Sequence, residues 1–224
     1  MKKNKNLVLA IDGPAGAGKS TIAKIVAKKL GILYVDTGAM YRAITWKALQ
    51  DKVNLRDPKL LLQMTRKTKI ILKQEPKKNL LRVFVNGEEV TNKIRTEKVS
   101  RQTNVVAAVL GVRKILRDQQ RALGKGGGVV MEGRDIGTSV FPKADHKFYL
   151  DASPTERALR RYTELRVKGK RVSLHQIAHA LAQRDYKDKH RGISPLKQAA
   201  DAIVIDSTDL TLEQVAQKIL DHIQ

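Results

Sequence analysis

The amino-acid sequence predicts an α/β fold with a five-stranded parallel sheet flanked by helices, and three observations support this. Five short apolar runs, typical of buried strands, alternate with segments of helical periodicity. A glycine-rich stretch, GPAGAGKS, follows the first run and leads directly into a helical segment. The length of 224 residues and the apolar fraction of 42% suit one folded domain with insertions rather than a disordered chain.

The predicted strands end at an aspartate in every case but one, which ends at a glutamate. The strands are LVLAID (7–12), ILYVD (32–36), GVVME (128–132), KFYLD (147–151) and AIVID (202–206). Helical patterns cover residues 19–30, 39–50, 96–123, 154–167, 173–187 and 211–223. The last helix starts at Thr211 and has Gln214 three residues later, which is the pattern of a capping box.

One segment, residues 68–95, interrupts the alternation of strands and helices. It contains three strand-like pieces, with turn signals at Glu75-Pro76 and Asn86-Gly87. Asn-Gly between alternating apolar residues is the strongest short-range signal for a β-hairpin. We therefore expect a small antiparallel insertion beside the parallel sheet.

The chain is strongly basic, with 44 lysines and arginines against 22 acidic residues and a formal net charge of +22 at pH 7. Such a charge attracts the phosphates of nucleotides, nucleic acids or anionic lipids. Because lysine is rarely buried, solvated helix faces explain much of the excess, and the charge alone identifies no function. The absence of cysteine excludes disulfides, thiolate zinc sites and cysteine nucleophiles.

Nothing in the hydropathy pattern predicts a membrane protein. The apolar runs are far shorter than the ~20 residues that a membrane-spanning helix needs. The run LVLAI is too short for the apolar region of a signal peptide, and it leads into the glycine-rich stretch. We expect a cytoplasmic monomer that does not bind membranes.

The stretch Gly13–Ser20 fits the phosphate-binding pattern G-x-x-x-x-G-K-[ST], the P-loop, between a predicted strand and a predicted helix. Glycines let the backbone wrap around a phosphate, consecutive N–H groups point inward, and the helix N-terminus adds its positive dipole. Lys19 would bridge the β- and γ-phosphates of ATP, and the Ser20 hydroxyl would bind Mg²⁺. The predicted ATP-binding residues are Gly13, Pro14, Ala15, Gly16, Ala17, Gly18, Lys19, Ser20 and Thr21.

A P-loop indicates a nucleoside triphosphate but not the reaction. The guanine-reading N-K-x-D of GTPases is absent, and so is the signature helix of ABC-type ATPases. A phosphate acceptor is already mostly ionised at pH 7, so that its phosphorylation needs charge neutralisation rather than a general base. The many arginines and the five scattered histidines, none at triad or metal-ligand spacing, fit this chemistry.

Four further segments carry a family resemblance: DTGAMYRAI (36–44), MEGRDIGTSVFP (131–142), RALRRYTELRVKGKR (157–171) and QRDYKDKHRGISPLKQAADAIVIDST (183–208). Together with the P-loop they resemble the bacterial cytidylate kinases, which are nucleoside-monophosphate (NMP) kinases, over nearly the whole chain. The resemblance implies the P-loop NMP-kinase fold, with an NMP-binding insertion and a helical lid. It divides the chain into core (1–65), insertion and start of the long helix (66–112), core (113–155), lid region (156–185) and C-terminal core (186–224).

The resemblance also implies which residues bind the acceptor, CMP. Thr37, Tyr41 and Arg42 follow the second strand, where ligands gather in open α/β sheets, and would contact the phosphate and sugar. A carboxylate at Asp135 can accept from N4 of cytosine, and Arg113 can donate to N3 or O2.

Further acceptor residues follow the third strand and lie in the last motif. Arg134 would bind a phosphate, Arg184 and Asp188 the ribose, and Arg191 a phosphate. The spacing of the last three, i, i+4 and i+7, predicts one helical face. The family has a base-contacting serine on the long helix, but this chain reads RQTNVVAA there, which offers Asn104 or Thr103 instead.

The lid would close over ATP and exclude water, with Arg157, Arg160 and Arg161 as transition-state contacts. Glu132, at the end of the third strand, stands where a P-loop protein carries a second residue that organises Mg²⁺, directly or through water. Asp12 is a rival for that role. The predicted catalytic residues are Lys19, Arg134, Arg157, Arg161 and Arg191.

The predicted reaction is transfer of the γ-phosphate of ATP to CMP or dCMP, with Mg²⁺ as cofactor. Three alternatives stay open: a kinase for UMP, AMP or a non-nucleotide alcohol, a basic P-loop protein that binds RNA as a switch, and an enzyme that also binds RNA or ribosomes loosely through its charge. The net charge favours the RNA-binding alternative, but the aromatic content is only 4% and no RNA-stacking motif is present. We expect no specific nucleic-acid binding, and only weak electrostatic RNA binding that moderate salt abolishes.

Overall fold

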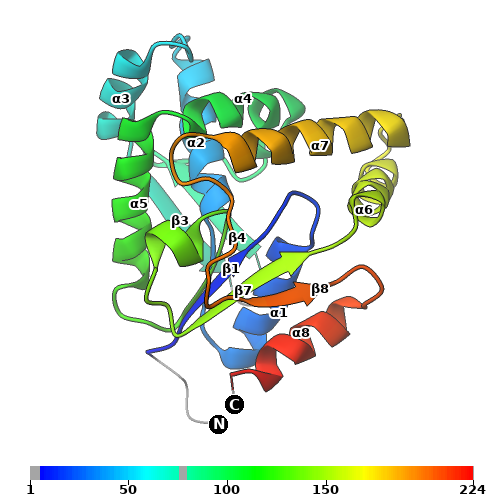
Figure 1. Ribbon diagram of the computed structural model, residues 1–224. Coiled ribbons are helices and arrows are strands. Elements are labelled where there is room, and N and C mark those ends of the chain that lie inside the picture. Colours follow the sequence, from blue (N-terminus) through cyan, green and yellow to red (C-terminus); the bar gives the residue numbers. More distant parts are fainter. Residues whose placement is uncertain (1–5, 76–79, 224) are drawn as a thin grey trace. The chain divides into compact units, whose positions relative to one another are not determined.

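A computed structural model of the chain describes residues 6–75 and 80–223 (Figure 1). It contains a five-stranded parallel sheet in the order β2-β6-β1-β7-β8, as the sequence predicted, and a three-stranded antiparallel sheet in the order β3-β4-β5. Each strand of the parallel sheet ends at the predicted acidic residue and starts within one residue of the predicted position. Its strands are β1 (Val8–Asp12), β2 (Leu33–Asp36), β6 (Val129–Glu132), β7 (His146–Asp151) and β8 (Ile203–Asp206).

Most of the helices lie where their periodicity placed them, and the first and the sixth have the predicted bounds. The helices described are α1 (Lys19–Leu30), α2 (Thr37–Gln50), α3 (Pro58–Lys67), α4 (Glu97–Ala107), α5 (Leu110–Gly124), α6 (Pro154–Val167), α7 (Leu174–His190) and α8 (Leu212–Asp221). A 3₁₀ turn, η2 (Lys93–Arg95), and one π-helical turn, η3 (Ile136–Val140), complete the set. Within the part of the chain that the structure describes, every helix is too short or too polar to span a lipid bilayer.

The single long helix predicted over 96–123 is wrong, because α4 and α5 are separate helices. The backbone becomes extended at Val109, which precedes α5. Gly111, in the first turn of α5, lies against α3, and a Cβ there would meet Leu62 at 2.7 Å. The turn lets α4 and α5 contribute Val106 and Val112 to the same buried cluster. Periodicity alone does not reveal such a change of direction, because both helices are amphipathic.

Helix α3 was not predicted, although its first turn carries recognisable signals. Asp57 is its N-cap and accepts the main-chain N–H groups of Lys59 and Leu60, and Pro58 occupies the first helical position. An aspartate followed by proline is a start signal for a helix.

The chain forms two compact units. Unit 1 contains the described residues up to Val8 and those from Ala27 to Glu132, and unit 2 contains Leu9–Val26 and those from Gly133 onward. In unit 1, helix α2 is buried on two faces. Met40 and Ile44 pack in one cluster with residues of α3, α4 and α5, and Ala43 and Trp46 pack in another with residues of β4.

The antiparallel insertion of unit 1 consists of β3 (Ile70–Glu75), β4 (Leu80–Val85) and β5 (Glu88–Glu89). The predicted hairpin at Asn86-Gly87 is confirmed, since both residues have positive φ, 49° and 90°, as a type I′ turn requires. The turn predicted at Glu75-Pro76 runs into residues 76–79, which lie outside the described residues.

Unit 2 is built on β1, β7 and β8, which are paired in parallel with Asp12 opposite Tyr149 and Asp151 opposite Asp206. The carboxyl ends of these strands therefore lie at one edge, where ligands bind in open α/β sheets. The predicted capping box of α8 is confirmed, because Thr211 Oγ1 accepts the main-chain N–H of Gln214 at 3.2 Å and Gln214 Oε1 accepts that of Thr211 at 2.8 Å.

Candidate active site

The P-loop connects β1 to α1 in unit 2, which is the context that the motif requires. Gly13, Gly16 and Gly18 have φ values of 147°, 81° and 86°, in the region that side chains disfavour. A Cβ at Gly13 would lie 2.0 Å from the main-chain oxygen of Leu150 on β7. The glycines thus permit both the turn of the loop and its close approach to the sheet.

Lys19, the first residue of α1, supplies the positive charge of this loop. Its side chain folds back so that Nζ donates to the main-chain oxygen of Pro14 at 2.5 Å, and the residue is only 5% exposed. The first turn of α1 contains no acidic residue, whereas Ser20 and Thr21 are exposed. A buried ammonium beside a helix N-terminus attracts anions, which is the property that a phosphate site needs.

Asp12, the last residue of β1, holds the segment that follows β6. Its two carboxylate oxygens accept the main-chain N–H groups of Ile136 and Gly137 at 2.9 and 2.8 Å. Burial raises the pKa of Asp12 to about 6, although these hydrogen bonds oppose the rise. Because this pKa exceeds the unfolded value, the folded state loses stability between about pH 4 and 6 as Asp12 ionises.

A cluster of arginines and aspartates in unit 2 brings together four residues predicted to bind CMP. Arg134 Nε lies 2.9 Å from Asp188 Oδ2, and Arg191 contacts both Asp188 Oδ1, at 3.7 Å, and Asp135 Oδ1, at 3.3 Å. Burial opposes the ionisation of Asp188. The positive charges of Arg134, Arg184 and Arg191 outweigh burial and lower its pKa. A cluster rich in arginine can bind a phosphate in bidentate fashion.

The prediction that Arg184, Asp188 and Arg191 share one helical face is wrong in one respect. Helix α7 ends at His190, and Arg191 has an extended backbone with ψ of 140°. Its side chain nevertheless returns to Asp188, and its Nε donates to the main-chain oxygen of Ser194 at 2.7 Å. Glycine and proline, at 192 and 195, follow directly and do not favour a continued helix.

The three lid arginines predicted as transition-state contacts lie in different surroundings on α6. Arg157 is buried and donates to the main-chain oxygens of Ala152 and Ala15. Arg160 donates to the main-chain and side-chain oxygens of Ser207, at 2.5 and 3.0 Å. Arg161 lies toward solvent and pairs with Glu164 at 2.6 Å.

Unit 1 contains the remaining predicted residues around the start of α2. Asp36 caps this helix by accepting the N–H of Ala39 at 2.8 Å, and it pairs with Arg42 at 2.6 Å. Burial opposes the ionisation of Asp36, but Arg42 and Arg95 outweigh it and lower its pKa. Thr37 donates its hydroxyl to the main-chain oxygen of Glu132 at 2.8 Å.

Glu132 and Tyr41 are both buried in unit 1. The Glu132 carboxylate accepts the hydroxyl of Tyr34 at 3.2 Å. The guanidinium of Arg113 lies over the Tyr41 ring at 5.3 Å and also donates to the main-chain oxygen of Ala107 at 3.2 Å. These contacts hold Arg113 in place in the interior of unit 1.

Thr103 and Asn104, the two alternatives predicted to contact the base, both lie on α4. The hydroxyl of Thr103 is used by its own helix, because it donates to the main-chain oxygen of Val99 at 2.7 Å. Asn104 is half-buried on the same helix, α4.

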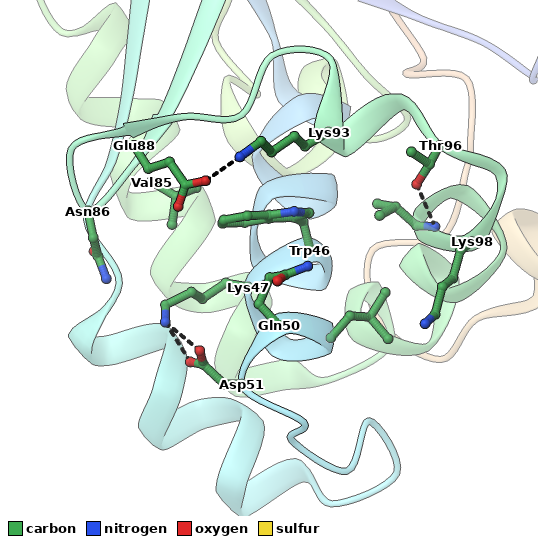
Figure 2. Close-up of a pocket in the computed structure, with 12 residues that line it drawn as sticks. Trp46, Lys47, Gln50, Asp51, Val85, Asn86, Glu88, Lys93, Thr96 and Lys98 are labelled. Atoms are coloured by element: carbon green, nitrogen blue, oxygen red, sulfur yellow. Dashed lines mark hydrogen bonds and ion pairs between the residues drawn. The ribbon is translucent and has the colours of Figure 1, made fainter.

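Unit 1 also contains a cavity of about 630 Å³ beside Trp46 (Figure 2). Trp46 lies between two exposed ion pairs, Lys93 with Glu88 at 2.5 Å and Lys47 with Asp51 at 2.6 Å (Figure 2). None of the twelve lining residues drawn is a predicted site residue. The charges that line this cavity are largely neutralised in pairs, and we assign it no ligand.

Sequence reasoning missed Asp185, which is buried on α7 and bonded to the P-loop. The motif QRDYKDKHR contains two aspartates, and only Asp188 was assigned a role. A carboxylate within such a basic segment is itself a signal, since it implies a nearby cation or N–H donor.

Comparisons with known proteins agree with the motifs. The family model described as cytidylate kinase matches residues 9–224. A cytidylate kinase of Ligilactobacillus salivarius is 48% identical over 221 residues, which cover 98% of this chain and 97% of that protein. A cytidylate kinase of Geobacillus sp. is 50% identical over 216 residues, 96% of each chain. A crystal structure of an uncharacterized protein from Eubacterium ventriosum is similar in fold alone, with a TM-score of 0.53, 13% identity and 98% of each chain covered.

Proposed function

The chain belongs to the cytidylate kinase family, and from this premise we propose that it transfers the γ-phosphate of ATP to CMP and dCMP. The products are CDP or dCDP, and ADP. The observation that supports the proposal most is that unit 2 contains both a phosphate-binding loop with a buried lysine and the arginine–aspartate cluster around Asp188. Such groups neutralise phosphate charge, and phosphoryl transfer depends on neutralised charge and alignment.

The P-loop is the proposed donor site. Lys19 would bind the β- and γ-phosphates, and the exposed Ser20 hydroxyl would provide one oxygen ligand to Mg²⁺. One protein hydroxyl fits this ion, which keeps several waters and also takes phosphate oxygens. Bound there, Mg²⁺ would neutralise charge on the β- and γ-phosphates. The role predicted for Glu132 in organising Mg²⁺ stays a prediction.

The acceptor needs no general base, because its phosphate oxygen is already ionised at neutral pH. In unit 2, Arg134 and Arg191 would bind that phosphate, and Asp188 with Arg184 would hold the ribose. Asp135 would accept from the N4 amino group of cytosine. In unit 1, the proposed acceptor-binding residues are Thr37, Tyr41, Arg42, Asn104 and Arg113.

The direct test offers the purified protein ATP and Mg²⁺ with CMP, dCMP, UMP, AMP or GMP and measures ADP production. We expect the highest kcat/KM for CMP and dCMP. Equal rates with UMP or AMP would show a different kinase. RNA binding at physiological salt without ATP turnover stimulated by CMP would instead support the RNA-binding alternative.

The proposed role of Asp135 predicts a change of base preference. Asp135→Asn replaces a group that only accepts hydrogen bonds by one that can also donate to O4 of uracil. We expect the ratio of kcat/KM for CMP to that for UMP to fall about tenfold or more, with KM for ATP within about twofold of wild type. Asp135→Ala should lose the preference for CMP without gaining activity on UMP.

The matched control is Asp118→Asn, which makes the same chemical change at an exposed position on α5. It should leave the preference unchanged. If Asp135→Asn retains the wild-type ratio while remaining folded, Asp135 does not read the base.

A further inference from the structure

A buried ion pair binds one residue of the P-loop from two sides. Arg157 on α6 and Asp185 on α7 are 8% and 6% exposed and are in direct contact through Nη1 and Oδ2. Asp185 Oδ1 accepts the N–H of Ala15 at 3.0 Å, and Arg157 Nη1 donates to the main-chain oxygen of Ala15 at 2.9 Å. The two ends of one ion pair thus occupy both main-chain polar groups of a single loop residue.

Two further contacts fix this arrangement within unit 2. Arg157 Nε donates to the main-chain oxygen of Ala152, just beyond β7, at 3.0 Å. Gly16 packs directly against Arg157, because a Cβ at Gly16 would lie 3.1 Å from both the Cβ and the main-chain oxygen of that arginine. Gly16, the loop residue that follows Ala15, therefore packs on the arginine as well.

The pair also controls the charge beside the phosphate site. A lone carboxylate at Asp185, bonded to a P-loop amide, would repel a bound triphosphate, and burial would strengthen that repulsion. Arg157 cancels this charge and is held in a planar, multiply bonded position that a lysine cannot reproduce. Removing one partner of a buried ion pair leaves an uncompensated charge. Loss of Arg157 would leave a negative charge and loss of Asp185 a positive one, so the two losses should affect triphosphate binding unequally.

We propose that Arg157 and Asp185 are positioning residues that set the course of the P-loop at Ala15, so that the loop amides beyond it bind the triphosphate of the donor. The identity of the donor as ATP rests on the proposed function. This role replaces, for Arg157, the direct transition-state contact predicted from the sequence. It also makes the donor site depend on α6 and α7, the helices of the predicted lid region.

The test measures dissociation constants by calorimetry for ATP, inorganic tripolyphosphate and CMP, each alone. For Arg157→Met we expect the constants for ATP and tripolyphosphate to rise together, about tenfold or more, with that for CMP within about threefold of wild type. Asp185→Asn should weaken both triphosphates less, because it removes a negative charge rather than exposing one. Arg157→Lys should restore part of the affinity, because it keeps the charge but not the planar fork.

Lys168→Met is the matched control, since it also removes a positive charge at the end of α6 but only breaks an exposed pair with Glu164. It should change no constant by more than about twofold. The proposal is overturned if folded Arg157→Met binds ATP as wild type does, or if ATP affinity falls while tripolyphosphate affinity does not. If Arg157→Met does not fold, Arg157→Lys provides the test. The proposal is overturned if Arg157→Lys binds both ATP and tripolyphosphate with wild-type affinity.

The proposed function and this inference fail separately. A wild-type protein that binds ATP but does not phosphorylate CMP would contradict the proposed reaction, and the calorimetric comparison would still decide the role of the ion pair. A protein that phosphorylates CMP with undiminished ATP affinity in Arg157→Met would contradict only the inference.

Discussion

Replacing Lys19 with methionine is expected to lower kcat for CMP phosphorylation by about a thousandfold, judged from the loss of a preorganised charged donor. Lys19, the first residue of α1, is 5% exposed, and its ammonium group donates to the main-chain oxygen of Pro14. Negative charge shifts onto the leaving oxygen, which bridges the β- and γ-phosphates, as the γ-phosphoryl group transfers, and methionine offers this oxygen no cation. Steady-state measurement of ADP production at saturating ATP and CMP gives kcat directly.

Lys28→Met is the control, because it removes the same charge from an exposed position in the last turn of α1. Its kcat should stay within about twofold of wild type. Thermal unfolding of both variants shows whether they are folded. A folded Lys19→Met protein that retains more than about a tenth of the wild-type kcat would contradict the donor role assigned to this lysine.

Asp188→Asn should destabilise the protein and impair acceptor binding together. The carboxylate is buried among Arg134, Arg184 and Arg191, so its loss leaves partly buried cations without their counter-charge. We expect the free energy of unfolding at pH 7 to fall by about 3 kcal/mol, and kcat/KM for CMP to fall about a hundredfold. Urea denaturation and initial rates measure the two effects.

The pH dependence of stability gives Asp188 an independent signature. Its folded-state pKa is lowered below the ordinary aspartate value of 3.8, so its contribution to stability is complete above that value and is lost as pH falls through the folded pKa. The wild type should therefore lose stability in acid more steeply than Asp188→Asn. Asp118→Asn, on the surface of α5, should follow the wild-type curve. Parallel acid curves for wild type and Asp188→Asn would show that the carboxylate is not stabilised by the arginines.

Several parts of the fold could be predicted because they depend on neighbouring residues. The strand ends, the Asn86-Gly87 hairpin, the Thr211 cap and the start of α1 at Lys19 all follow from patterns a few residues long. In each case a backbone preference or a local hydrogen bond determines the conformation. The same holds for the P-loop, whose glycines have the positive φ values that its motif implies.

The break between α4 and α5 required knowledge of distant packing. Both halves have helical periodicity, and the chain turns where Gly111 allows α5 to approach Leu62 of α3. Similarly, Arg191 falls beyond the end of α7, and its place in the cluster depends on Asp135, 56 positions earlier. No pattern within a single helix contains this information.

The lid arginines show the division between the two kinds of information. The sequence RALRR establishes a basic helix in a kinase-like context and makes Arg157, Arg160 and Arg161 equal candidates. Folding makes them unequal: Arg157 is buried and bonded to Ala15, Arg160 is bonded to Ser207, and Arg161 is partly exposed and paired with Glu164. The physical reason is that an arginine's role is set by the groups that desolvate and bond it. For Arg157 one of those groups lies 142 positions away along the chain.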